Sequence, residues 1–197
     1  MRIPLALLTL AGVCQAAAAG TVSSAYTDLD WKTDCVTYAQ AADGEGDWAD
    51  LACSGYRGYP VMIAYGDDRE SLFYGFPPSD MTPVWESFSA FNSSAAKIEW
   101  RIETDGGIAV PFAAIHRRSI SNSEDPGKMT EVLVVSKVAQ PDRFQGCNVG
   151  LVLATGNPAA NEQARKIADE KARIFTCGKD RRVTIGGAVP DFGRLDN

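Results

Sequence analysis

Two apolar runs and one helical pattern within residues 130–178 constrain the fold more than any other feature of the chain. Residues 130–139 and 147–155 are apolar at nearly every position, which is typical of strands with both faces covered. Residues 157–176 then place small and large apolar side chains on one stripe of helical period. The stripe consists of Ala160, Ala164, Ile167, Ala168, Ile174 and Phe175. The pattern predicts two central strands followed by a long C-terminal helix packed across one face of a sheet.

Polar stripes accompany these apolar ones. Along the predicted helix, Arg165–Asp169 and Asp169–Arg173 have the spacing of exposed ion pairs, each worth a few tenths of a kcal/mol. A strand predicted at residues 97–104 alternates apolar residues with Glu99, Arg101 and Glu103, which we expect to form an ion-pair ladder on their own face. Glu99 and Glu103 would lie about 13 Å apart at roughly 3.3 Å per residue, too far for the two carboxylates of a glycosidase.

The register of the next hairpin follows from the same alternation. Residues 105–107 turn the chain into a strand at residues 108–120. A three-residue loop pairs Trp100 with Phe112, whereas a two-residue turn places Arg101 beside an apolar residue, because a one-residue slip moves a whole side-chain set across the sheet. We therefore predict a three-residue loop with a bulge and a glycine in the left-handed conformation.

Residues 1–19 have the pattern of a secretory signal peptide. Arg2 is basic, residues 3–13 are apolar, and four alanines precede a cleavage point after Ala19. The apolar run is shorter than the roughly 20 residues that span a bilayer. Cys14 is the alternative, a lipid-attachment site, but it lacks the small preceding residue. We expect the mature protein to be periplasmic or secreted, with no membrane span.

The remaining residues, 20–197, have the size of a single domain. The whole chain has 19 basic and 25 acidic residues, for a net charge of −6, and loss of Arg2 makes it more acidic. Nucleic acid and anionic membranes are bound by basic surfaces, so both are excluded as expected partners.

Four cysteines follow the predicted leader. An even number in an exported chain indicates two disulfides. Three pairings are open, and we predict the two that are local in sequence, Cys35–Cys53 and Cys147–Cys177. A zinc site is the alternative, but the chain has no Cys-x-x-Cys spacing and a single histidine. We expect no metal and no cofactor.

Residues 20–58 are predicted to be an appendage of the domain, with a loose polar arm at 20–34 and a hairpin closed by Cys35–Cys53. The turn of this hairpin is acidic, with oxygen-bearing side chains at alternating positions that hint at a calcium loop. They are Asp43, Glu45, Asp47 and Asp50. Trp48 and Ser54 occupy the positions where an EF-hand has glycine and a bidentate glutamate, so a solvated acidic turn is the favoured interpretation.

The middle and the end of the chain supply further elements. Strands are predicted at residues 61–65, 71–76 and 182–185. Thr82-Pro83 is a typical helix start, and the apolar residues Val84, Phe88 and Phe91 would share one face of a short helix. The predicted fold class is therefore α+β: a mostly antiparallel sheet with a short helix, a long C-terminal helix on one face and two disulfides.

Recognisable catalytic chemistry is sparse. His116, the one histidine, lies at a strand end, where a satisfied structural residue is the favoured interpretation, and no nucleophile elbow or phosphate-binding motif is present. Asp67, Asp68 and Glu70 form an acidic turn that could serve a hydrolase acting on cell-envelope polymers. We expect a protein that is not an enzyme and keep the hydrolase as the alternative.

The turn at residues 55–60 is rich in tyrosine and arginine. Tyr56, Arg57 and Tyr59 have the composition of a recognition surface, and equally that of a sheet with amphipathic edges. The predicted function is a non-catalytic binding or interaction module with a periplasmic protein or envelope ligand as partner.

Four segments spread over the chain carry a resemblance. Gly55-Tyr-Arg-Gly-Tyr-Pro60, Lys97-Ile-Glu-Trp-Arg101, Pro111-Phe-Ala-Ala-Ile115 and Ala164-Arg-Lys-Ile-Ala-Asp169 together resemble a family of small exported alphaproteobacterial proteins. This resemblance implies a Gram-negative periplasm and no particular activity. Ser54-Gly-Tyr56 is also similar to a short piece of periplasmic lysozyme inhibitors, which are small disulfide-bonded β proteins; the predicted long helix departs from their barrel.

Overall fold

A six-stranded sheet is the central layer of the computed structural model, which describes residues 20–78, 83–122, 125 and 127–195. Its strand order is β1-β7-β8-β9-β10-β11, antiparallel except that β11 runs parallel to β10. The strands span Thr21–Asp28 (β1), Asn92–Asp105 (β7), Ile108–Ser121 (β8), Met129–Lys137 (β9), Cys147–Leu153 (β10) and Val183–Ile185 (β11). As predicted, β9 and β10 are inner strands with both faces covered.

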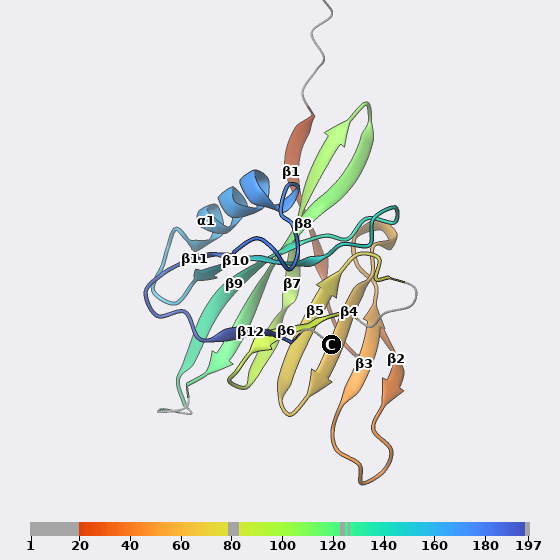
Figure 1. Cartoon of the computed structure of the whole chain (residues 1–197), viewed down its shortest axis with the longest axis vertical. Helices are drawn as coiled ribbons and strands as arrows, with labels where there is room; N and C mark the ends of the chain where they lie inside the picture. The colour runs from red at the N-terminus through yellow and green to blue at the C-terminus, as the bar shows by residue number, and fades with distance from the viewer. Residues whose placement is uncertain (1–19, 79–82, 123–124, 126, 196–197) are drawn as a thin grey trace, which may run out of the picture.

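A helix covers one face of this sheet (Figure 1). It consists of α1 (Ala160–Ile167) and a π-helical turn, η2 (Ala168–Ala172). Small residues face the sheet, so the helix lies close to it, as shown by Gly150 of β10, where an added Cβ would come within 2.7 Å of Ile167. The core between the two layers includes Val135, Val149, Ala164 and Phe175.

The opposite face of the central sheet carries two smaller sheets, so the fold is a β-sandwich with a helix outside it. One has four antiparallel strands in the order β2-β3-β4-β5, and the other pairs β12 with β6. The strands span Cys35–Gln40 (β2), Ala49–Cys53 (β3), Val61–Gly66 (β4), Arg69–Tyr74 (β5), Trp85–Phe88 (β6) and Phe192–Leu195 (β12). Trp100 is fully buried in the core between the central and four-stranded sheets.

Both predicted disulfides are present. Cys35–Cys53 joins directly opposed residues of β2 and β3, and Cys147–Cys177 joins the start of β10 to the segment after the helix. Within the described residues, no helix is long and apolar enough to cross a membrane.

The prediction of a long C-terminal helix is wrong, and with it the predicted α+β class: the protein is mostly β. The helix ends at Ala172, before the predicted end near residue 176. Two features draw the chain away from the helix. Lys137 donates hydrogen bonds through Nζ to the carbonyl oxygens of Arg173 and Phe175, and Cys177 is tied to β10. Ile174, which the helical stripe placed in the core, is 75% exposed.

The short helix predicted from Thr82-Pro83 is also wrong where it can be compared, since Thr82 lies outside the described residues. The segment forms β6, which pairs with β12 from the C-terminal tail. Phe88 is buried against Phe192 of that tail, whereas Phe91 is 53% exposed, so the two do not share a face. A partner more than 100 residues away in sequence overrides the local helix signal.

Two smaller predictions also fail. The expected loose arm at residues 20–34 contains β1, which pairs along its whole length with β7. The β7–β8 loop has two residues, Gly106 and Gly107, both with positive φ, instead of three. The bulge lies further from the loop, where the register changes between Arg101 and Ile102, and it places Phe112 on the helix side of the sheet.

Candidate functional site

The 55–60 turn connects β3 to β4 and packs on the central sheet. Its middle residues, Tyr56–Gly58, form one 3₁₀ turn, and the Tyr56 ring centroid lies 6.3 Å from that of Trp100. Gly55 is required by this packing, because a Cβ there would lie 2.2 Å from the carbonyl oxygen of Tyr59 and 2.9 Å from the Trp100 ring. The turn is therefore fixed against the core at its start.

Arg57 lies at the tip of the turn. Its backbone has the left-handed values φ 46° and ψ 45°, and Gly58 follows with φ 87°. A non-glycine residue in this region is strained by roughly 1 kcal/mol or more. The Arg57 side chain is exposed, with its guanidinium carbon 5.4 Å from the ring centroid of Tyr56. The fold therefore keeps the backbone of Arg57 in a strained conformation, with its charged side chain exposed to solvent.

Tyr59 fixes the other end of the turn. Its hydroxyl donates to Oε1 of Gln140 at 2.8 Å, and its ring contacts Phe76 edge-on with centroids 5.1 Å apart. Partial burial raises the pKa of Tyr59, and the nearby charge of Asp142 adds to the effect. The three residues of the predicted site therefore occupy different positions: Tyr56 and Tyr59 are half-buried anchors, and Arg57 alone faces outward.

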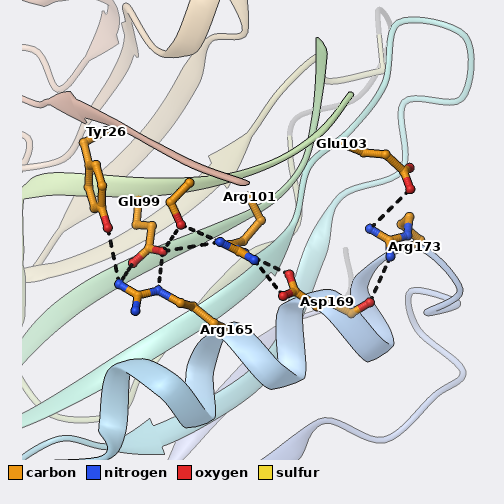
Figure 2. A network of polar contacts seen from close by, with 8 residues as sticks. Tyr26, Glu99, Arg101, Glu103, Arg165, Asp169 and Arg173 are labelled. Carbon is orange, nitrogen blue, oxygen red and sulfur yellow. Dashed lines mark hydrogen bonds and ion pairs between the residues drawn. The ribbon is translucent and has the colours of Figure 1, made fainter. Parts of the chain in front are cut away.

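A second polar cluster joins the helix to the central sheet (Figure 2). Glu99 and Arg101 are almost completely buried, although both were expected on a polar face of the sheet. Glu99 accepts from Nε of Arg165 at 2.6 Å, and Arg101 binds both carboxylate oxygens of Asp169, at 2.8 and 2.7 Å. Ser24 of β1 bonds to both Glu99 and Arg101. A third pair, Glu103 and Arg173, lies beside them. We call this cluster the helix–sheet network; it pairs three acids with three arginines, namely Glu99, Glu103 and Asp169 with Arg101, Arg165 and Arg173.

The helix–sheet network accounts for the carboxylates that were considered for hydrolysis on β7. Glu99 is held by Arg165, and Glu103 lies 3.9 Å from Arg173 (Figure 2). The guanidinium of Arg173 also stacks 4.1 Å above the ring of Phe112. These charges are matched by one another, which is the arrangement of a structural clamp.

His116 is buried between the layers with no exposed surface. Its Nε2 lies 2.6 Å from the carbonyl oxygen of Ala95, so Nε2 carries the hydrogen and Nδ1 accepts from the hydroxyl of Tyr74 at 2.8 Å. Burial lowers the pKa of His116 to about 4, and the nearby charge of Arg118 acts in the same direction. A neutral, enclosed imidazole with both nitrogens bonded has a structural role.

The acidic turns are not assembled into a metal site. Among the residues that the structure describes, no group of three or more histidine, cysteine or acidic side chains could hold a metal ion. Asp47 instead accepts a hydrogen bond from the backbone of Asp67. Asp68 accepts from the hydroxyl of Tyr65, and Glu70 is buried 3.4 Å from Arg118.

One group of residues was missed by the sequence predictions. Glu86 of β6, Arg182 and Arg194 of β12 meet at a cavity of about 480 Å³ beside the Cys147–Cys177 disulfide. Burial raises the pKa of Glu86, although the backbone of Asn148 and the two arginines favour its charged form. The sequence feature that could have indicated this group is an acidic residue between the apolar Trp85 and Phe88. It was not considered, because the segment was predicted to be a short helix.

The comparisons with known proteins give no relative. The chain matches no protein family, and searches of curated proteins and of solved structures found nothing similar. Its function must therefore be argued from its own geometry.

Proposed function

We propose that this is an exported, non-catalytic binding protein that inserts Arg57, at the tip of the 55–60 turn, into an acidic site of a partner protein. The observation that carries the proposal is the left-handed, exposed Arg57 between two anchored tyrosines. Backbone strain of this kind persists only where the surroundings fix it, and it is often found at functional sites.

Rigid presentation favours binding. Ordering a mobile loop costs free energy on association, and the contacts of Tyr56 and Tyr59 remove most of that cost in advance. Arginine is enriched among the residues that dominate interface energies, and its planar guanidinium binds carboxylates in bidentate fashion.

The partner that fits is a protein with a carboxylate-lined cleft. The chain itself is acidic, so long-range attraction does not steer it toward an acidic partner, and recognition must depend on the local contact of Arg57. Glycosidases carry two carboxylates about 5–10 Å apart in a cleft, which is a target of suitable size and charge. The similarity of Ser54-Gly-Tyr56 to lysozyme inhibitors makes a lysozyme the first partner to test.

Export is part of the proposal. Residues 1–19, the proposed signal peptide, lie outside the described residues. The two disulfides are compatible with an oxidising compartment. The proposed location is the periplasm, in accordance with the resemblance to exported alphaproteobacterial proteins.

The test is a comparison of the oxidised mature protein with two variants. Arg57→Ala removes the presented cation, and Lys166→Ala is the matched control, because it removes an exposed positive charge on the helix side of the central sheet. Each is used to inhibit a purified lysozyme and to capture proteins from periplasmic extract. We expect the parent and Lys166→Ala to behave alike and Arg57→Ala to lose at least tenfold in affinity, about 1.4 kcal/mol.

Binding that survives Arg57→Ala unchanged would refute the site. If the protein alone degrades peptidoglycan, the hydrolase alternative takes its place. Inhibition of lysozyme identifies the partner class, whereas capture of another protein, lost with Arg57→Ala, keeps the turn as the site and replaces the partner.

A further inference from the structure

We propose that the pocket beside the β4–β5 turn binds a primary alkylammonium group, with Asp68 as its counter-ion. This pocket and the 55–60 turn lie at opposite ends of β4, a strand of 6 residues that spans roughly 20 Å. The proposal therefore does not depend on the function assigned to the 55–60 turn. The volume of the pocket is about 240 Å³. Pockets that enclose a whole ligand measure about 300–1,000 Å³, so this one suits a single functional group with a short stem.

One side of the pocket is formed where three neighbouring strands begin or end. The backbone N–H of Ser121, the last residue of β8, donates to the carbonyl oxygen of Phe91, and Ser121 is paired with Met129 of β9. The three side chains therefore lie in a row on one face of the sheet. Phe91 and Met129 are 53% and 43% exposed. The alkyl stem of an amine would cover this apolar surface, which is favourable in water.

The β4–β5 turn supplies the charge. It is tied to the row of side chains, because the backbone N–H of Asn92 donates to the carbonyl oxygen of Asp68 at 2.9 Å. Oδ1 of the Asp68 carboxylate accepts from the hydroxyl of Tyr65 at 2.8 Å, and this hydrogen bond raises the pKa of Tyr65. Oδ2 of Asp68 has no partner in the part of the chain that the structure describes. The carboxylate is thus oriented through one oxygen and open at the other.

The other acids near the turn are already neutralised. Asp67 forms an ion pair with Arg69, and the buried Glu70 lies 3.4 Å from Arg118. Asp68 has no such cationic partner among the described residues, and none of the residues that line the pocket is an arginine or a lysine. The charge of Asp68 is therefore left for a ligand to neutralise. The net charge of −6 on the whole chain also favours a cation.

The remaining polar groups favour an ammonium that carries hydrogens. Ser93 and Ser121 line the pocket, and neither hydroxyl is hydrogen-bonded within the described residues. With Oδ2 of Asp68 they supply three acceptors, and a primary ammonium has three donors. A quaternary ammonium would leave all three acceptors unpaired. The matching chemistry is that of a lysine side chain or of a free alkylamine.

The test is a ¹⁵N NMR titration of the oxidised mature protein with n-butylammonium chloride, tetramethylammonium chloride and sodium butyrate, each against sodium chloride at equal ionic strength. We expect n-butylammonium to cause saturable shifts of the amides of Asp68, Ser93 and Ser121. Tetramethylammonium, which has no N–H donor, should bind at least tenfold more weakly, and butyrate should not bind. No saturable shift with n-butylammonium, or equal binding of tetramethylammonium, overturns the proposal.

Nα-acetyl-lysine amide distinguishes the two sources of the ammonium. Affinity equal to that of n-butylammonium supports the lysine side chain of a partner, because the backbone of the probe is then accommodated. Affinity at least tenfold lower supports a free alkylamine.

Asp68→Asn tests the counter-ion. Asparagine tolerates the left-handed φ of 54° at this position and keeps an acceptor for Tyr65, so the turn is preserved. We expect n-butylammonium to bind roughly tenfold more weakly, because a charge-assisted hydrogen bond is lost. Asp43→Asn is the matched control, since it removes an exposed carboxylate from the β2–β3 turn and should leave the affinity unchanged.

Unchanged affinity in Asp68→Asn, or an equal loss in Asp43→Asn, overturns the assignment of Asp68. Ser121→Ala removes one acceptor without altering the β4–β5 turn, so it tests the pocket even if Asp68→Asn does not fold. It should weaken n-butylammonium binding severalfold, and unchanged binding counts against the pocket.

Discussion

Arg101→Ala should destabilise the protein more than any other single change in the helix–sheet network. The Arg101 side chain is 10% exposed and makes two bonds to Asp169 and one to Ser24. Removing one partner of a buried ion pair costs about 3–5 kcal/mol. Asp169 is 33% exposed and can be partly rehydrated, and Glu99 keeps Arg165, so the lower end, about 3 kcal/mol, applies.

This loss is measurable by thermal and urea unfolding at pH 7 with the disulfides intact. For a chain of this length about 3 kcal/mol corresponds to roughly 6–12 °C in Tm. Lys166→Ala, an exposed change on the same helix, should stay within about 0.5 kcal/mol of the parent. Combining Arg101→Ala with Asp169→Ala should cost less than the two single changes together by about 1–3 kcal/mol. Additive losses of stability in the double variant, or a cost of Arg101→Ala below about 1 kcal/mol, would refute a stabilising role of the helix–sheet network.

Two further outcomes follow from buried positions. The folded state favours neutral His116. The contribution of His116 to stability, roughly 3 kcal/mol, is therefore present above pH 6.5 and is lost as pH falls through about 4. An imidazole NMR signal that titrates near pH 6.5 would contradict this prediction. Gly55→Ala should lower Tm by several degrees and break the hydrogen bond from the Tyr59 hydroxyl to Gln140, because the added methyl group collides with backbone and with Trp100. Gly193→Ala is the control and should change Tm little, because nothing lies within 4 Å of a Cβ at that position. Equal effects of the two substitutions would show that the turn adapts to the added methyl group.

Much of the sheet could be predicted because its signals are local. Strands β9 and β10 are continuous apolar runs, and residues 97–104 of β7 alternate polar with apolar side chains in sequence. The errors arose where a distant segment decides the structure. The pairing of β6 with β12 joins residues far apart in sequence. Neither strand is long or periodic enough for the pairing to be predicted from the sequence.

The candidate sites also differ in how far they could be predicted from the sequence. Composition indicated the 55–60 turn, but only the structure distinguishes the anchoring Tyr56 and Tyr59 from the presented Arg57. The cavity at Glu86 could not be predicted from the sequence. Arg194 becomes a neighbour of Glu86 through the unpredicted β6–β12 pairing, and Arg182 reaches Glu86 from the residue just before β11, which pairs with β10.

The charge pattern of the helix–sheet network was present in the sequence. It was assigned to solvent-exposed faces, whereas in the structure the charges of the strand and of the helix face each other. Glu99, Arg101 and Glu103 repeat every two residues on a strand, a spacing of about 6.6 Å, and Arg165, Asp169 and Arg173 repeat every four on a helix, about 6 Å. The two stripes have opposite signs at each step and nearly the same pitch, so each charge meets its complement when the helix lies along β7 (Figure 2). Each stripe considered alone belongs in solvent, because an unpaired buried charge is costly. Considered together, the stripes specify how far along the sheet the helix must lie, which its small apolar residues alone would leave free to slide.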